Sequence, residues 1–166
     1  MRILEAENLF KKGLVALVEG DPGRATSHFE WAMHIERDRG VERPQMRYLS
    51  YYGLGLALSR KPSSDAVRTC ETAARVDFFN PDFHFNLGKV YLIAGKTTKA
   101  LAAFERGLRL APSHAGLRIE MDKVERRSRP AIPWLGRNHV LNKRLWILLA
   151  SLSSRRAPLR RTASPP

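Results

Sequence analysis

Residues 86–91 have the sequence AsnLeuGlyLysValTyr, and they are followed at wider intervals by Ala100, Phe104, Gly107 and Pro112. Apolar and small residues in this stretch recur every three or four positions, which is the spacing of an amphipathic helix. The turn-forming sequence AlaGlyLysThrThr at 94–98 interrupts that spacing. The stretch therefore predicts two helices joined by a short turn.

The same pattern occurs twice more, closer to the N-terminus. Tyr51 stands 33 residues before His84, and Ala66 stands 34 residues before Ala100. The middle copy consists of Tyr51, Leu54, Gly55, Leu58, Ala66, Cys70 and Ala73. The first copy consists of Leu9, Gly13, Ala16, Ala25, Phe29 and Ala32. A period of this length predicts helix pairs that stack on their neighbours.

The order of Leu87, Gly88, Tyr91, Ala100 and Phe104 resembles the tetratricopeptide-repeat family. The resemblance implies an all-α, right-handed superhelical solenoid, and the length is similar to that of small bacterial members. Three helix pairs are expected at about 6–39, 48–80 and 81–114, with a capping helix at 115–127 completing a domain of residues 1–128. A proline-containing linker and an apolar, basic-flanked helix are expected over 129–154, and a disordered basic tail over 155–166.

Glycines and prolines support these helix positions. Gly13, Gly55 and Gly88 lie inside helical stripes, where glycine costs about 1 kcal/mol relative to alanine. Close approach of neighbouring helices would explain them, with Phe29 and Phe104 filling the space within their pairs. Asp21 before Pro22 and Asn80 before Pro81 predict two helix N-termini.

The resemblance also implies where a partner would bind, because the first helix of each repeat lines a concave groove in this family. We predict a non-catalytic adaptor, scaffold or chaperone-like module that binds an apolar or amphipathic protein segment in that groove. The expected groove residues are Phe10, Leu14, Tyr52, Leu56, Phe85, Asn86 and Lys89. Only Asn86 and Lys89 suit a carboxylate clamp, so the C-terminal tail of a heat-shock chaperone is not the expected ligand. The alternative that the aromatic residues are ordinary core stays open.

A second candidate surface is the apolar helix expected at 141–152. Its run is far shorter than the ~20 residues that span a bilayer. It could lie on an anionic membrane surface, pack on the last repeat or fill the groove. The residues concerned are Lys143, Arg144, Leu145, Trp146, Leu148, Leu149, Arg155 and Arg156.

The net charge of +13 is concentrated in the C-terminal quarter of the chain. Residues 126–166 contain ten basic and no acidic residues, so a nucleic acid could bind there non-specifically. The basic residues of this segment are not interleaved with several stacking aromatics, as those of a nucleic-acid site would be. Non-specific nucleic-acid binding therefore remains the less favoured alternative.

Catalysis has little support in the sequence. The five histidines are scattered, and no metal-ligand motif or phosphate-binding glycine loop accompanies them. We predict no enzyme activity, cofactor or metal, a buried Cys70 thiol and a core position for His84. The N-terminal residues do not resemble a secretory signal, which favours a cytoplasmic protein, or one peripheral to the inner face of the membrane. The sequence leaves the oligomeric state and the partner open.

Overall fold

A computed structural model describes residues 2–41, 45–59 and 63–128. This part of the chain contains seven helices and no strand. The helices are α1 (Arg2–Val18), α2 (Pro22–Arg37), α3 (Met46–Ser59), α4 (Ser64–Val76), α5 (Pro81–Ile93), α6 (Thr97–Leu110) and α7 (Ala115–Ser128). The predicted all-α fold is confirmed. The helix and tail expected beyond residue 128 lie outside the described residues.

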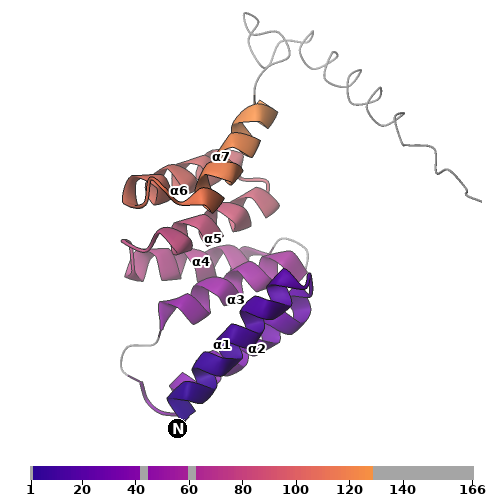
Figure 1. Ribbon diagram of the computed structural model, residues 1–166, viewed down its shortest axis with the longest axis vertical. Helices are drawn as coiled ribbons and strands as arrows, with labels where there is room; N and C mark the ends of the chain where they lie inside the picture. The colour runs from indigo at the N-terminus through magenta and orange to yellow at the C-terminus, as the bar shows by residue number, and fades with distance from the viewer. Residues whose placement is uncertain (1, 42–44, 60–62, 129–166) are drawn as a thin grey trace, which may run out of the picture. The chain divides into compact units, whose positions relative to one another are not determined.

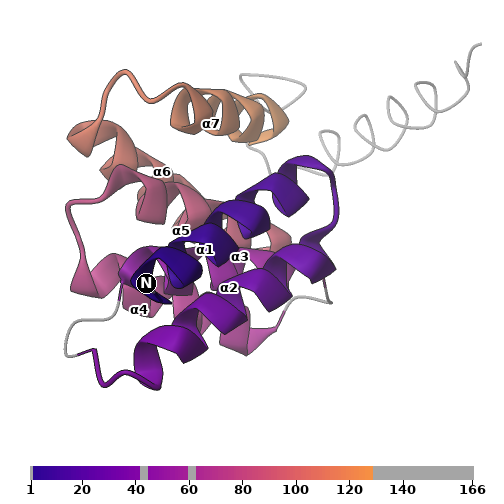
Figure 2. The same cartoon turned by 60° about the horizontal axis from the view of Figure 1, so that its bottom comes forward.

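The helices form antiparallel pairs that stack in the order of the sequence. α1 packs on α2, α3 on α4 and α5 on α6, while α3 also contacts α2 and α5. Figure 1 shows this succession from α1 and α2 at the bottom to α7 at the top. Figure 2 shows α1 and α2 side by side at the end of the stack opposite α7. The described helices up to Val124 form one compact unit with the architecture of an all-α repeat solenoid.

Close approach within the pairs depends on the glycines of the repeat. A Cβ atom added to Gly88 would lie 2.8 Å from Cζ of Phe104 and still closer to the edge of the same ring. Gly13 stands in the same relation to Phe29, and both rings are completely buried. The expectation that these glycines make room for Phe29 and Phe104 is confirmed. Gly55 serves a different contact, since its added Cβ would clash with Thr26 of the preceding pair.

Side-chain caps begin three of the helices. The Asp21 carboxylate accepts a hydrogen bond of 2.9 Å from the Arg24 amide, and Asn80 accepts one of 3.1 Å from the Asp82 amide. Both of the predicted N-termini are therefore confirmed. Ser63 caps α4 in the same way, through the Ala66 amide. These caps satisfy amide groups that the first turn of a helix leaves without a partner.

Replacing Asp21 with alanine should lower the free energy of unfolding by about 1 kcal/mol, because the Arg24 amide loses its acceptor. Urea denaturation followed by circular dichroism measures the change. Asp21→Ser is the matched control, since serine caps about as well as aspartate, and it should retain most of the stability. Equal losses in the two variants would show that the charge of Asp21 matters more than its cap.

Candidate functional site

Five of the predicted groove residues lie half-buried on the first helices of successive pairs. Leu14 is on α1, Tyr52 and Leu56 are on α3, and Phe85 and Lys89 are on α5. We call these five residues the first-helix face. The four apolar or aromatic members each rest on the core with one side and reach solvent with the other. Such side chains can be covered by a partner without any change in the helices beneath them.

Phe10 is not part of this face, which corrects the prediction made from the repeat register. Its side chain is 6% exposed, and its ring centroid lies 5.1 Å from Tyr48, 5.3 Å from Tyr51 and 5.6 Å from Phe29. The guanidinium of Arg47 covers a further side at 5.2 Å. Because α3 brings three of these four neighbours, Phe10 joins the first pair to the second and is unavailable to a partner.

Asn86 is also buried, and this too corrects the groove prediction. Its side chain is 1% exposed, and Nδ2 donates a hydrogen bond of 3.1 Å to Oγ of Ser50. Ser50 in turn offers its carbonyl to the Cys70 thiol at 3.3 Å. Asn86 therefore links α5 to α3 through polar contacts inside the core. Of the two residues suited to a carboxylate clamp, only Lys89 reaches the first-helix face.

His114 lies beside Phe85 at the C-terminal end of the first-helix face, with Asp82 next to it, and neither was predicted as a site residue. His114 packs its ring 5.5 Å from that of Phe85, and its Nε2 lies 3.0 Å from Oδ1 of Asp82. The Leu117 amide donates to Nδ1 of His114 at 3.1 Å. With Nδ1 accepting, Nε2 carries the hydrogen and donates to Asp82, so the neutral ring already satisfies both contacts. In the sequence, Asp82 stands near the start of a first helix and His114 stands just after Pro112. These two positions were the signal by which they could have been found.

Lys89 and His114 together limit the freedom of Phe85. The Lys89 ammonium lies 5.3 Å from the centroid of the Phe85 ring, a cation–π arrangement. Gly116 is also close, since a Cβ added there would lie 3.1 Å from the ring. Phe85 is therefore held in one orientation before any partner arrives. A fixed aromatic ring loses less entropy on binding than a mobile one.

Burial raises the pKa values of two side chains of the second helix pair. Burial raises the pKa of Tyr51, and the nearby Asp82 carboxylate raises it further. Burial raises the pKa of the Cys70 thiol to about 12, so the thiol stays protonated and unreactive at neutral pH. His84 is buried, with Nε2 donating to the Phe78 carbonyl at 2.7 Å. The predictions of a buried Cys70 and a core His84 are confirmed.

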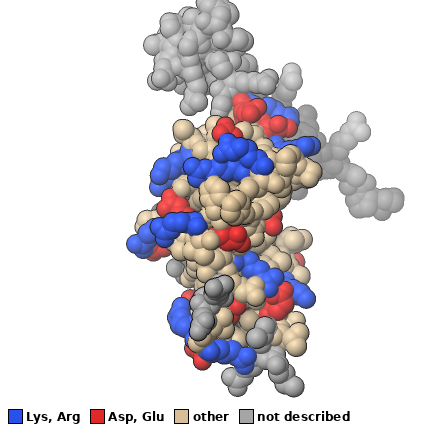
Figure 3. Space-filling model, turned by 90° about the vertical axis from the view of Figure 1, so that its left-hand side faces the viewer, with Lys and Arg blue, Asp and Glu red and all other residues tan. Residues whose placement is uncertain are grey.

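Charges of both signs are spread over the surface of the described repeats. Figure 3 shows one face on which lysine and arginine alternate with aspartate and glutamate, with uncharged areas between them. Within the described residues, no helix combines the length and apolar character needed to cross a bilayer. The same residues hold no cluster of three metal-ligating side chains. The predicted membrane or docking residues, Lys143 to Arg156, lie outside the described part of the chain.

The sequence pattern of the tetratricopeptide repeat family matches residues 81–114, the same bounds as the third predicted repeat. The matched residues form the pair α5 and α6, and the contact of Gly88 with Phe104 lies inside that pair. Residues 81–114 are a tetratricopeptide repeat. None of the curated proteins compared with this chain matches it.

Two solved structures have the same fold as this chain. The Arabidopsis OM64 TPR domain superposes with a TM-score of 0.60 at 16% identity, over 76% of this chain and 99% of that one. The P58(IPK) TPR domain superposes with a TM-score of 0.61 at 20% identity, over 74% of this chain but 33% of that one. Identities this low establish the shared fold and leave the ligand to be argued from this chain's own residues.

Proposed function

We propose that this tetratricopeptide-repeat protein is a non-catalytic interaction module whose first-helix face binds an apolar or amphipathic segment of a partner protein. Tetratricopeptide repeats generally mediate protein–protein interactions. The observation that supports this particular site is the recurrence of half-exposed apolar side chains on α1, α3 and α5, with Lys89 as a cationic neighbour. An adaptor or scaffold needs a surface of this kind and no reacting group.

The apolar members of the first-helix face supply the driving force for such binding. Fully burying a side chain of this size contributes about 1.5–3 kcal/mol, and these partly buried side chains have at most about a third of that left to gain. Tyr52, Leu56 and Phe85 together could then contribute at most a few kcal/mol before the cost of ordering the partner is subtracted. Lys89 adds selectivity, because it favours a segment with a carboxylate or carbonyl beside its apolar residues.

Site-specific photo-cross-linking tests the proposed face in the full chain. A photoreactive amino acid placed at Leu56 or Lys89 should capture the same partner from cell extract, identified by mass spectrometry. The matched control position is Arg106, which is exposed on the second helix of the same pair as Phe85. It should capture that partner at least about tenfold less, since the contacts of the first-helix face are not shared by α6.

Tyr52→Glu should reduce this capture by about tenfold or more, because a carboxylate replaces apolar contact area. Phe79→Glu is the matched control, since Phe79 is a strongly exposed aromatic residue between α4 and α5, and it should have little effect. A thermal melt near that of the parent shows that the fold persists, and Lys89→Glu is a second variant if Tyr52→Glu melts early. Equal capture at Arg106, or capture unchanged in both face variants, would rule out the first-helix face.

A further inference from the structure

The first helix pair presents an apolar stripe that no other described helix covers. α3 and α5 each pack against a helix of the preceding pair, whereas the described residues include no such helix for α1. Leu4, Val15 and Val18 are 67%, 55% and 89% exposed. Together with Lys11 they recur at intervals of seven, four and three residues, so they share one side of α1. This is the spacing by which one helix packs along another.

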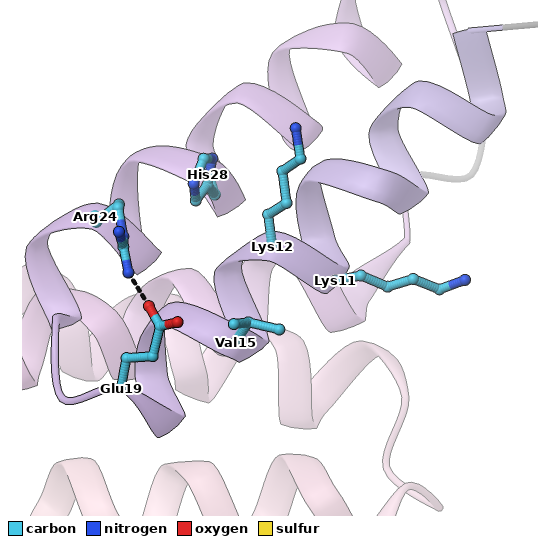
Figure 4. A pocket seen from close by; sticks show the side chains of 6 residues that line it. All are labelled: Lys11, Lys12, Val15, Glu19, Arg24 and His28. Atoms are coloured by element: carbon cyan, nitrogen blue, oxygen red, sulfur yellow. Dashed lines mark hydrogen bonds and ion pairs between the residues drawn. The ribbon is translucent and has the colours of Figure 1, made fainter.

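A shallow hollow of about 340 Å³ runs beside this stripe, between α1 and α2. Figure 4 shows Lys12 rising between the two helices, Lys11 pointing away along α1, and Arg24 paired with Glu19. Its lining residues are Lys11, Lys12, Val15, Glu19, Arg24 and His28. Glu19 and Asp21 are both occupied by Arg24, and no ion pair in the described part of the chain involves Lys11 or Lys12. The hollow therefore carries a net positive charge from Lys11 and Lys12.

On α2, an exposed aromatic residue follows the charged and polar residues that line the hollow. Trp31 is 63% exposed and lies seven residues after Arg24 and three after His28, on the same side of its helix. Large aromatic residues with this exposure are frequent at the centres of protein interfaces. We call the α1–α2 face the group of Leu4, Lys11, Lys12, Val15, Val18, His28 and Trp31, in which His28 is half-buried and the other six residues are exposed.

We propose that the α1–α2 face docks an acidic amphipathic helix of a partner protein. The apolar side of that helix would cover Leu4, Val15 and Val18, and its carboxylates would pair with Lys11 and Lys12. The stripe from Leu4 to Val18 is about 21 Å long at 1.5 Å per residue, so it takes a helix of about four turns. Phe85 and Lys89 of the first-helix face lie on α5, two helix pairs further along the chain, whereas Leu14 of that face borders Lys11 and Val18 on α1.

Charge excludes the two other occupants that the chain itself could provide. A second copy whose α1 packed antiparallel on this stripe would bring Lys11, at the middle of the stripe, against its own counterpart. The segment 126–166 contains ten basic and no acidic residues, so it would be repelled as well. An acidic helix gains both from covering the apolar stripe and from neutralising the two lysines. Charge complementarity therefore selects a partner of that composition.

Fluorescence anisotropy of the full chain with a designed peptide pair tests the proposal. One 18-residue peptide has leucine at the a and d positions of its heptads and glutamate at e and g, and its twin has lysine in place of every glutamate. The glutamate peptide should bind at least about tenfold more tightly than the lysine twin, and added salt should weaken it. Equal affinity for the twins, or no binding of the glutamate peptide, overturns the proposal.

Exposed substitutions locate the binding surface without disturbing the fold. Val15→Glu should weaken the glutamate peptide by about tenfold, while Val76→Glu, at a similarly exposed valine of α4, should not. The double variant Lys11→Glu with Lys12→Glu should reverse the preference between the twins. Phe85→Glu should leave this binding unchanged, which separates the α1–α2 face from the first-helix face. Unaltered binding in Val15→Glu and in the lysine variant overturns the proposal.

Two further results would assign the face to the chain itself and so contradict an acidic partner. One is a dimer of the full chain in sedimentation experiments that Val15→Glu converts to monomer. The other is a glutamate peptide that binds a chain ending at Ser128 and fails to bind the full chain. A monomeric full chain that binds the peptide is the expected result.

Discussion

Phe10→Ala should lower the free energy of unfolding by about 3–5 kcal/mol, the range found when a buried phenylalanine is truncated. The Phe10 ring is 6% exposed and touches Phe29 of its own pair and Tyr48 and Tyr51 of the next. Removing it leaves a cavity at the junction of three helices, which the fixed backbones can close only in part. Urea denaturation followed by circular dichroism measures the loss.

Trp31→Ala is the matched control, since it removes a larger aromatic side chain from the same helix pair. Trp31 is 63% exposed, and its ring neighbour His34 lies 6.1 Å away, so the cost should stay below about 1 kcal/mol. Repeat proteins gain stability pair by pair, so Phe10→Ala should speed amide hydrogen exchange in α1 and α2 while α5 and α6 stay protected. If Phe10→Ala lowered the free energy of unfolding as little as Trp31→Ala, Phe10 would be accessible to a partner and would belong to the first-helix face.

The parts of the fold that could be predicted from the sequence are those fixed by contacts inside one repeat. The distances along the chain from Gly13 to Phe29 and from Gly88 to Phe104 are the same, and the two pairs make the same contact in the structure. The caps at Asp21 and Asn80 act within a single turn of helix, so a short stretch of sequence contains everything that forms them. Periodicity and turn chemistry were sufficient for these features.

The burial of the candidate site residues depends on contacts between repeats. Aligning equivalent positions of the repeats in the sequence does not predict these contacts. Phe10 and Phe85 occupy the same position in their repeats, yet Phe10 is buried and Phe85 is half-exposed. The difference arises because Tyr48 and Tyr51, from the pair that follows, close over Phe10. The sequence between the first two pairs is longer than the repeat requires, and it does not specify how α3 meets α1.

The α1–α2 face was missed for a related reason. Its residues belong to positions that a solenoid covers with a neighbouring pair, so the pattern of an internal repeat gives no sign that they are exposed. Leu4, Val15 and Val18 look like an ordinary core stripe when the helix is considered alone. Only the arrangement of the pairs shows that α2 packs on the opposite stripe of α1, which contains Ala6, Gly13 and Ala16.

Gly88→Ala should lower the free energy of unfolding by about 1–3 kcal/mol, although alanine is the better helix former by about 1 kcal/mol. The new methyl group would overlap the ring of Phe104, which is completely buried and closed in by α5 and α6. The helices must therefore separate or the ring must leave its preferred rotamer. Because the strain exceeds the gain in helix propensity, chemical denaturation should show a net loss.

Gly23→Ala is the control for Gly88→Ala, because it should change the free energy of unfolding in the opposite direction. Gly23 is exposed in the first turn of α2, and the nearest atom to an added Cβ is Oδ1 of Asp21 at 3.6 Å, an ordinary contact. Alanine there should raise the free energy of unfolding by up to about 1 kcal/mol, because it restricts the unfolded chain without any clash. If Gly88→Ala also stabilised the protein, the close packing of α5 on α6 through Phe104 would be wrong.

A double-mutant cycle separates the clash from other effects of the Gly88 substitution. Phe104→Leu alone should cost about 1 kcal/mol, since leucine fills less of the same space. Combined with Gly88→Ala, it should make room for the new methyl group, so that the double variant is more stable than the sum of the single changes by at least about 0.5 kcal/mol. Additive losses would mean that the methyl group at residue 88 does not meet the ring, and that Gly88 is required for some other contact in the repeat.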